Sequence, residues 1–395
     1  MPGYRLFMQA AFAALAALTF TQPAGAQADT AMLSRLKDYV AEQGAALDWE
    51  RIETRTDGGG APVTVLRNAR ISSDSGAVSL PAVEIADAGA EDGGGWRIGR
   101  LTIPAFSQKV ENSEFVVHGM SVRDLVLPMQ GQAAVPASYR GLTIRDLTYN
   151  VHRLEIMKAS GLRVAFTPPD AGAASAFTGS VEAFEVNLDS LRDPQTQATV
   201  DALGYRKLSG SIAFDGSWEE ATGRLVLDSY DITVADAGTL RLSLDAAGVG
   251  LPFLAAAARL QGHMAAAPEA NPMMGMLAAM GLLAQTQLHS ARVSFEDDSL
   301  TRRAVAVAAR RNGQDTNAAA AGFARMAEAW TRVVNDPELT RQTAEATRRF
   351  LADPRSLTIV VAPKAPVSGA AIAMGFLQGV PGLAQQLGIE VLANE

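Results

Sequence analysis

A long stretch of the chain, from about Val63 to Leu244, alternates apolar and polar residues in short runs separated by glycine, aspartate or asparagine. The clearest runs are VTVLRNARI, WRIGRLTI, EFVVHGMSVRDLVL, GLRVAFT, SVEAFEVNL, GSIAFDGSW, GRLVLDSYDITV and GTLRLSLDAAG. Successive side chains of a strand point to opposite faces, so this alternation predicts strands with one apolar face. We therefore expect an antiparallel, β-rich body over residues 61–250, built as an open groove or a sandwich.

From about Leu251 the pattern changes, and alanine, methionine, arginine and glutamine at helical spacing replace the alternation. Asn271-Pro272 and Asp336-Pro337 are typical helix starts, with a capping residue followed by proline at the first helical position. Strands are expected near residues 289–296, 355–363 and 389–392. The region 251–395 is thus predicted to be helix-rich with a few strands, which makes the whole chain an α+β protein.

The segment 27–60 is expected to form a short amphipathic helix followed by a linker. Between Thr30 and Gln43 the apolar residues Leu33, Leu36 and Val40 recur at the spacing of one helix face. This helix needs another element against which to bury that face.

Two segments of the β-rich body repeat each other. Gly119 to Leu125 reads GMSVRDL, and Gly141 to Leu147, 22 residues later, reads GLTIRDL. A period near 20 residues predicts repeated β-units. Strict alternation then places the arginine and the aspartate of each copy on opposite faces. Because the pair is repeated, we interpret these charges as solvated or cross-strand groups rather than as a site.

The first 26 residues have the features of a secretory signal peptide. Arg5 precedes an apolar run from Ala10 to Phe20, Pro23 follows, and Ala24-Gly25-Ala26 has the small-x-small pattern of a cleavage site. The alternative is an uncleaved anchor, although the apolar run is shorter than the roughly 20 residues that a membrane span needs. We expect cleavage after Ala26, a periplasmic location and no retained transmembrane helix.

Charge and cysteine content narrow the classes of function. The net charge is −8, and it becomes −9 once the single positive charge of Arg5 is removed with residues 1–26. This acidity argues against nucleic acid as a partner. The chain has no cysteine, so it has no disulfide, no thiolate metal site and no thiol nucleophile.

No known catalytic or metal-binding motif stands out. The chain lacks G-x-S-x-G, H-E-x-x-H and a phosphate-binding loop. Ser34 and Lys37 match S-x-x-K, but the S-D-N and K-T-G motifs that accompany it are missing. The histidines, which are His118, His152, His263 and His289, show no metal-ligand spacing. We therefore predict no catalytic, cofactor-binding or metal-binding residue and no cofactor.

The densest charge cluster is FEDDSLTRR, with Glu296, Asp297 and Asp298 followed by Arg302 and Arg303. It lies between an alternating run and a run at helical spacing that ends in Asn-Gly, a typical left-handed C-cap. We interpret it as a strand-to-helix joint in which Asp298 or Ser299 accepts from the first helical turn, and we predict Asp298 as the N-cap. The alternative is an acidic site for hydrolysis or metal, although adjacent strand residues point to opposite faces.

Four stretches of the chain resemble uncharacterised exported proteins of alphaproteobacteria. They are LHSARVSFEDDSLTRRAVAVAARRNGQ, FLADPRSLTIVVAPKAPVS, LGIEVLAN and, upstream, LGYRKLSGSIAFDGSWEEATGRLVLDSYDITVADAGTLRLSLDAAG. The strand-rich, amphiphilic repeats also resemble the periplasmic AsmA-type proteins, whose open β-grooves are linked to lipid movement. These resemblances imply an exported β-rich fold and bring no catalytic residue.

Three functions are therefore open. The first is a periplasmic, non-enzymatic protein that binds lipid or an envelope partner. The second is an envelope hydrolase whose site is assembled from distant residues. The third is a scaffold or assembly factor for envelope proteins.

The export hypothesis makes a direct prediction. Protein recovered from cells should begin at Gln27 and be found in the soluble periplasmic fraction, because cleavage removes the apolar segment. N-terminal sequencing after cell fractionation checks this. An intact N-terminus in the membrane fraction would instead support the anchor.

Overall fold

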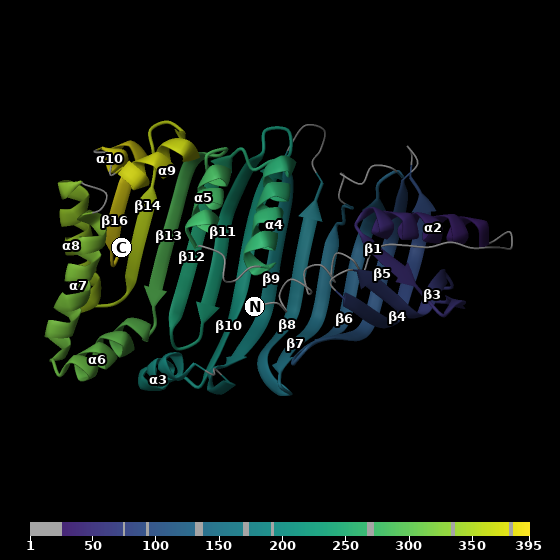
Figure 1. Ribbon diagram of the computed structural model, residues 1–395, viewed down its shortest axis with the longest axis horizontal. Helices are drawn as coiled ribbons and strands as arrows, with labels where there is room; N and C mark the ends of the chain where they lie inside the picture. The colour runs from purple at the N-terminus through teal and green to yellow at the C-terminus, as the bar shows by residue number, and fades with distance from the viewer. Residues whose placement is uncertain are drawn as a thin grey trace. The chain divides into compact units, whose positions relative to one another are not determined.

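The computed structural model describes residues 26–73, 76–91, 95–130, 137–168, 174–190, 193–266, 272–332, 336–378 and 382–395. The expected signal peptide lies outside these residues except for Ala26. The chain forms two compact units, one made of residues 1–167 and 179–184 and the other of residues 168–178 and 185–395. Each contains an antiparallel sheet, and helices are concentrated toward the C-terminus (Figure 1). The predicted α+β class with an antiparallel, β-rich body is confirmed.

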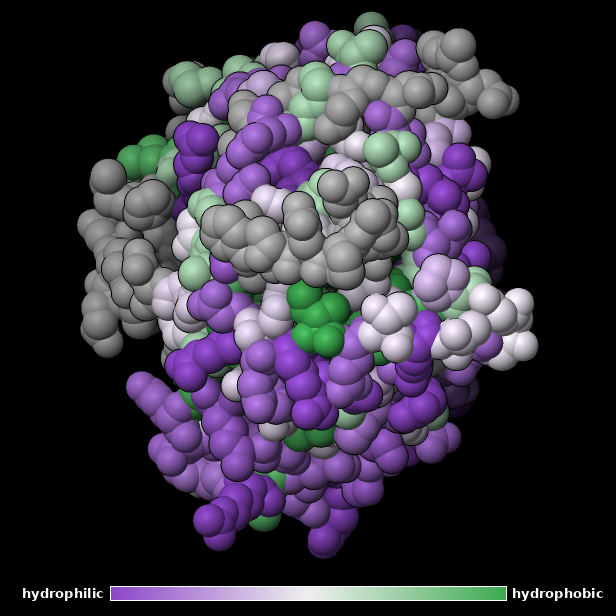
Figure 2. All heavy atoms as spheres, turned by 90° about the vertical axis from the view of Figure 1, so that its right-hand side faces the viewer, coloured by the Kyte–Doolittle hydropathy of each residue, from purple (hydrophilic) through white to green (hydrophobic). Residues whose placement is uncertain are grey.

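The first unit is a sheet of long strands preceded by one helix. Its strands follow the order β1-β3-β4-β5-β6-β7-β8, and β2 also pairs with β3. The elements are α2 (Ala26–Glu42), β1 (Ala45–Asp48), β2 (Arg51–Thr56), β3 (Pro62–Ser73), β4 (Gly76–Ala90), β5 (Trp96–Val110), β6 (Ser113–Leu127), β7 (Gly141–Val151) and β8 (Leu154–Thr167). The side seen in Figure 2 is covered mainly by hydrophilic side chains, with small hydrophobic patches between them.

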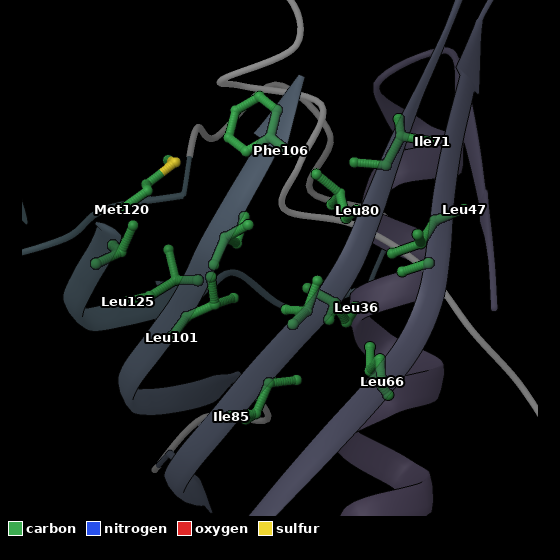
Figure 3. Packing of buried hydrophobic residues seen from close by; sticks show 14 of the residues in the cluster. Leu36, Leu47, Leu66, Ile71, Leu80, Ile85, Leu101, Phe106, Met120 and Leu125 are labelled. Atoms are coloured by element: carbon green, nitrogen blue, oxygen red, sulfur yellow. The ribbon is translucent and has the colours of Figure 1, made fainter. Parts of the chain in front are cut away.

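Helix α2 closes the core of this unit. Leu33, Leu36 and Val40 are buried, as the helical spacing predicts. Leu36 lies close to Leu66 and Leu80 from the strands (Figure 3). Burial of a leucine side chain contributes about 1.5–3 kcal/mol, so the helix is held chiefly by this apolar face.

A buried arginine and a buried tyrosine orient the same helix. The Arg35 guanidinium donates to the carbonyls of Pro128 and Met129, at 2.7 and 3.1 Å, and forms an ion pair with Glu42. The Tyr39 hydroxyl accepts a hydrogen bond from the Ala137 backbone N–H, and burial raises the pKa of this phenol. Because both polar groups find partners, their burial is tolerated, and α2 is tied to the backbone that follows β6.

The core residues of the long strands do not alternate strictly. Along each strand, core residues are spaced alternately two and three positions apart. The core residues therefore switch between even and odd positions along the strand. In β5 the core residues are Ile98, Leu101, Ile103 and Phe106, and in β6 they are Val117, Met120, Val122 and Leu125. Several of the gaps contain a residue of positive φ, namely Asn68, Asp87, Gly119, Asp124 and Gly161. A residue in the left-handed conformation accommodates one extra residue between two core positions, so that the next core side chain still points to the core.

The repeated segments lie opposite each other in β6 and β7. Met120 pairs with Ile144, and Arg123 pairs with Gly141. The copies therefore run antiparallel, so that the glycine of each lies beside the arginine of the other. A Cβ on Gly119 would lie 3.0 Å from Arg145 Cβ, and one on Gly141 would lie 2.9 Å from Arg123 Nη2. Each glycine thus makes room for the other copy's arginine.

The predicted placement of the repeated charges on opposite faces is wrong. Arg145 Nε lies 3.0 Å from Asp146 Oδ2, so the two side chains meet on the same side. Asp124 pairs with Arg97 of β5. Both charges of each copy fall in the gap of three between core residues, which strict alternation does not anticipate. Their interpretation as solvated or cross-strand charges agrees with these contacts.

The second unit carries a sheet in the order β10-β11-β12-β13-β14-β16. Its strands are β10 (Lys207–Glu219), β11 (Arg224–Val234), β12 (Gly238–Ala247), β13 (Gln287–Asp297), β14 (Ser356–Val361), β15 (Val367–Ser368), which pairs with β13, and β16 (Ile389–Ala393). Strand β9 (Ser175–Asn187) contributes residues 179–184 to the first unit and its remaining residues to the second.

The helices of the second unit lie between and after these strands. They are α3 (Pro194–Leu203), α4 (Leu251–Ala266), α5 (Pro272–Leu283), α6 (Leu300–Asn312), α7 (Thr316–Arg332), α8 (Pro337–Ala352), α9 (Gly369–Gln378) and α10 (Leu383–Leu387), with a 3-10 turn at Leu188–Ser190. Asp336 caps α8 by accepting from the Leu339 N–H at 2.9 Å, as predicted. The predicted cap Asn271 lies outside the described residues.

The glycine beside the repeated arginine gives a test of this architecture. Gly119 has φ +66° and is crowded by Arg145, so Gly119→Ala should lower the free energy of unfolding by about 1–2 kcal/mol. Gly89 in β4 has no atom within 4 Å of a built Cβ, so Gly89→Ala is the matched control and should be neutral or slightly stabilising. Urea denaturation measures both. Equal effects at the two positions would contradict the role of Gly119.

Candidate functional site

The charge cluster at the start of α6 is a structural joint. Strand β13 ends at Asp297, and Asp297 Oδ1 accepts a hydrogen bond from the Thr301 N–H at 2.7 Å. The predicted cap, Asp298, is wrong. Its side chain is exposed, and the cap position belongs to Ser299, which makes no side-chain capping bond. The turn brings the last strand residue in front of the first helical turn, which a pattern of consecutive acids does not reveal. The predicted C-cap is confirmed, since Gly313 is left-handed.

The neighbouring acids of this joint point apart. Glu296 forms an ion pair with Arg241 of β12, which also contacts Asp231 of β11 at 3.3 Å. Asp297 turns instead toward α6. Glu296 and Asp297 therefore cannot act as a carboxylate pair on one substrate, in agreement with the alternation of the strand.

The arginines of the cluster also have structural partners. The Arg303 guanidinium lies 4.5 Å from the ring centroid of Tyr205, and it donates to Ser299 Oγ and to the Leu203 carbonyl. The Tyr205 hydroxyl donates to the Asp236 carbonyl at 2.9 Å. Arg303 thus ties the first turn of α6 to the segment after α3.

Lys37, His118 and His152, considered from the sequence, lie on separate segments of the first unit. Lys37, on α2, forms an ion pair with Asp48 at 3.3 Å. His118 is exposed on β6 opposite Asp146, and His152 lies in the turn after β7. Among the described residues, no group of three or more histidines and acids could hold a metal ion.

A depression of about 500 Å³ lies between α7 and α8. Its lining includes Glu328, Asp336, Arg341 and Arg348. Asp336 is engaged as the cap of α8, and Arg341 is paired with Glu338 and Glu345. These engaged charges stabilise α8.

The sheet of the second unit is amphipathic, with one apolar face. Three rows of side chains cross it from strand to strand in direct register. They are Ile212, Ile232, Leu240, Phe295, Leu357 and Ala393; Phe214, Tyr230, Leu242, Val293, Ile359 and Val391; and Leu227, Leu244, Ala291, Val361 and Ile389. We call this surface the apolar face. Cross-strand apolar pairs of this kind stabilise the sheet and form a continuous hydrophobic surface.

The opposite face of the same sheet is polar and internally paired. Asp231, Arg241 and Glu296 form a row of charges, and Ser294 Oγ lies 2.8 Å from Thr358 Oγ1. At the end of β11, Arg224 donates to Asp245 at 2.8 Å and holds the pKa of that carboxyl below its usual range.

Helices cover the apolar face only in part. At one end Phe350 of α8 packs edge-on against Phe295, and at the other Leu387 of α10 packs near Val361. Between them Val293 remains 38% exposed and Ile359 43% exposed, although they are paired across β13 and β14. Val293 and Ile359 thus form an exposed apolar pair in the middle of the apolar face.

A family model described as "Uncharacterized protein" matches residues 231–394, which run from within β11 to the last strand. The match includes the apolar face from β12 onward and the joint at Asp297. No curated protein matches the chain. In the part of the chain that the structure describes, no helix combines the length and the apolar character that a membrane crossing demands.

The joint can be tested by substitution. Asp297→Ala removes the acceptor of a first-turn N–H and should lower the free energy of unfolding by about 0.5–2 kcal/mol. Asp297→Asn keeps an oxygen that can accept a hydrogen bond from this N–H and should retain most of the stability. Asp298→Ala should cost less than about 0.5 kcal/mol, because its side chain is exposed.

Thermal melting with and without calcium or EDTA provides the measurement. A loss at Asp298→Ala as large as at Asp297→Ala would refute the assignment of the cap. A large calcium-dependent shift would show that the cluster binds metal.

Proposed function

We propose that this protein is a periplasmic, non-enzymatic protein that binds the acyl chains of lipids on its apolar face. The observation that carries the proposal is the half-exposed Val293–Ile359 pair within three apolar rows, on a sheet whose other face is polar and ion-paired. A sealed core would bury this pair. Acyl chains need only contact with such rows, because they have no hydrogen bonds to satisfy.

Three further features support the proposal. Glu296, Asp297 and Asp336 are engaged in structural contacts. The signal-peptide features of residues 1–26 and the resemblance to exported alphaproteobacterial proteins favour an envelope location. The architectural resemblance to AsmA-type proteins, which are linked to lipid movement, favours lipid over a protein partner.

A matched pair of variants in β14 tests the binding site. Ile359 belongs to the apolar face, whereas its neighbour Val360 lies on the other face, between Arg292 and Glu390. Ile359→Gln should weaken binding of a soluble short-chain NBD-labelled phosphatidylethanolamine by about tenfold, equivalent to about 1.4 kcal/mol. Val360→Gln should leave it nearly unchanged. Fluorescence titration measures both affinities, and circular dichroism checks that the variants remain folded.

Native mass spectrometry of protein purified from the envelope adds a test without a probe. Lipid should be recovered with the wild-type protein and reduced with Ile359→Gln. Equal probe binding by both variants, or no lipid recovered and no probe bound, would overturn the proposed function.

A further inference from the structure

Helix α5 is unusual because it has no polar side. Its sequence, PMMGMLAAMGLL, contains no charged or hydrogen-bonding side chain, and α9 (GAAIAMGFLQ) has only its final glutamine. A helix that is apolar all around belongs in a protein core or in lipid, whereas a surface helix has a polar stripe.

Yet α5 does not lie in a core. Among its described side chains none is buried, and Leu277 and Leu283 are 49% and 51% exposed. Met374 of α9 is 48% exposed. These exposed side chains leave an apolar area uncovered in this part of the second unit.

These helices form one surface, which we call the helical patch: α4, α5 and α9. Helix α5 contacts both α4 and α9. The Gly369 N–H at the start of α9 donates to the Thr286 carbonyl at 2.8 Å, and a Cβ on Gly369 would lie 1.8 Å from the Leu283 carbonyl oxygen. On its inner side α9 packs through Ile372 into the cluster of Leu383 and Leu387. The patch is thus attached to a packed body.

The chemistry of the patch identifies its occupant. A specific protein interface carries roughly one hydrogen bond per 100–200 Å² and a polar rim, and α5 has no side chain that could supply either. The hydrocarbon of a lipid bilayer requires no hydrogen bond and can surround a helix whose every side is apolar. The charged residue of α4, Arg259, is the lone charge in the sequences of the three helices.

Length determines how the patch meets a bilayer. At 1.5 Å per residue the 12 residues of α5 extend about 18 Å, less than the roughly 30 Å of hydrocarbon in a membrane. We propose that α4, α5 and α9 insert into the hydrocarbon of one leaflet of a lipid bilayer. With so little charge, attachment rests on apolar burial and is insensitive to salt. This inference concerns a different surface from the apolar face and does not depend on it.

Flotation with phosphatidylcholine vesicles tests the inference on the mature full chain. Wild-type protein should float with the vesicles equally at low and high salt. The double variant Leu277→Gln/Leu283→Gln should reduce the apparent affinity by about tenfold or more, because two half-exposed apolar side chains are lost from the contact. Leu154→Gln is the matched control, since Leu154 is 57% exposed but lies in β8, outside the patch, and it should float like wild type.

The absence of cysteine permits a second measurement that reports position. An NBD label attached at Leu277→Cys should shift to the blue and brighten when vesicles are added, whereas a label at Leu154→Cys should not change. The short-chain lipid probe separates this inference from the proposed function, because Leu277→Gln/Leu283→Gln should still bind the probe and Ile359→Gln should still float.

Three results would overturn the inference. One is failure of the wild-type protein to float with vesicles. Another is an equal loss with Leu154→Gln, and a third is loss of flotation at high salt. A wild-type dimer in solution that Leu277→Gln/Leu283→Gln dissociates, without vesicle binding, would show that a second copy of the chain covers the patch.

Discussion

The structure depends on one constraint: neighbouring strands must direct their apolar side chains to the same face at the same level. In the second unit this produces direct rows, such as Leu242, Val293 and Ile359, that run from strand to strand. Because side chains alternate along each strand, the opposite face becomes polar at the same time, and Asp231, Arg241 and Glu296 can pair there. The same strand register therefore produces an apolar face and a polar face.

The first unit meets the same constraint with a different spacing. In neighbouring strands an extra residue lies between core positions at the same height in the sheet. Left-handed residues such as Gly119 and Asp124 make this possible. The glycine of each repeated segment also leaves space for the arginine of the other, so the repetition reflects two antiparallel strands fitting together. Unlike the second unit, this one has a deep core, which Leu36 of α2 completes.

The second unit leaves part of its apolar surface uncovered. In the second unit α8 and α10 bury the ends of the apolar face, whereas Val293, Ile359 and the outer sides of α5 and α9 remain accessible. Uncovered apolar surface carries a free-energy cost of roughly 25 cal/mol per Å², which contact with lipid removes. In the densest charge cluster, by contrast, Asp297 joins β13 to α6 and Arg303 ties the first turn of α6 to Leu203.

The sequence by itself determined the α+β class, the helix at residues 30–43 and the caps at Asp336 and Gly313, because periodicity and capping depend on neighbouring residues alone. Only the tertiary structure decided that Asp297, and not Asp298, accepts the hydrogen bond from the first turn of α6. The turn between β13 and α6 determines which carboxylate faces the helix. The tertiary structure also decided that the charges of each repeat share a side, and that Val293 stays half-exposed while Phe295 packs against Phe350. Alternation identifies an apolar face, but coverage of that face depends on elements distant in the chain.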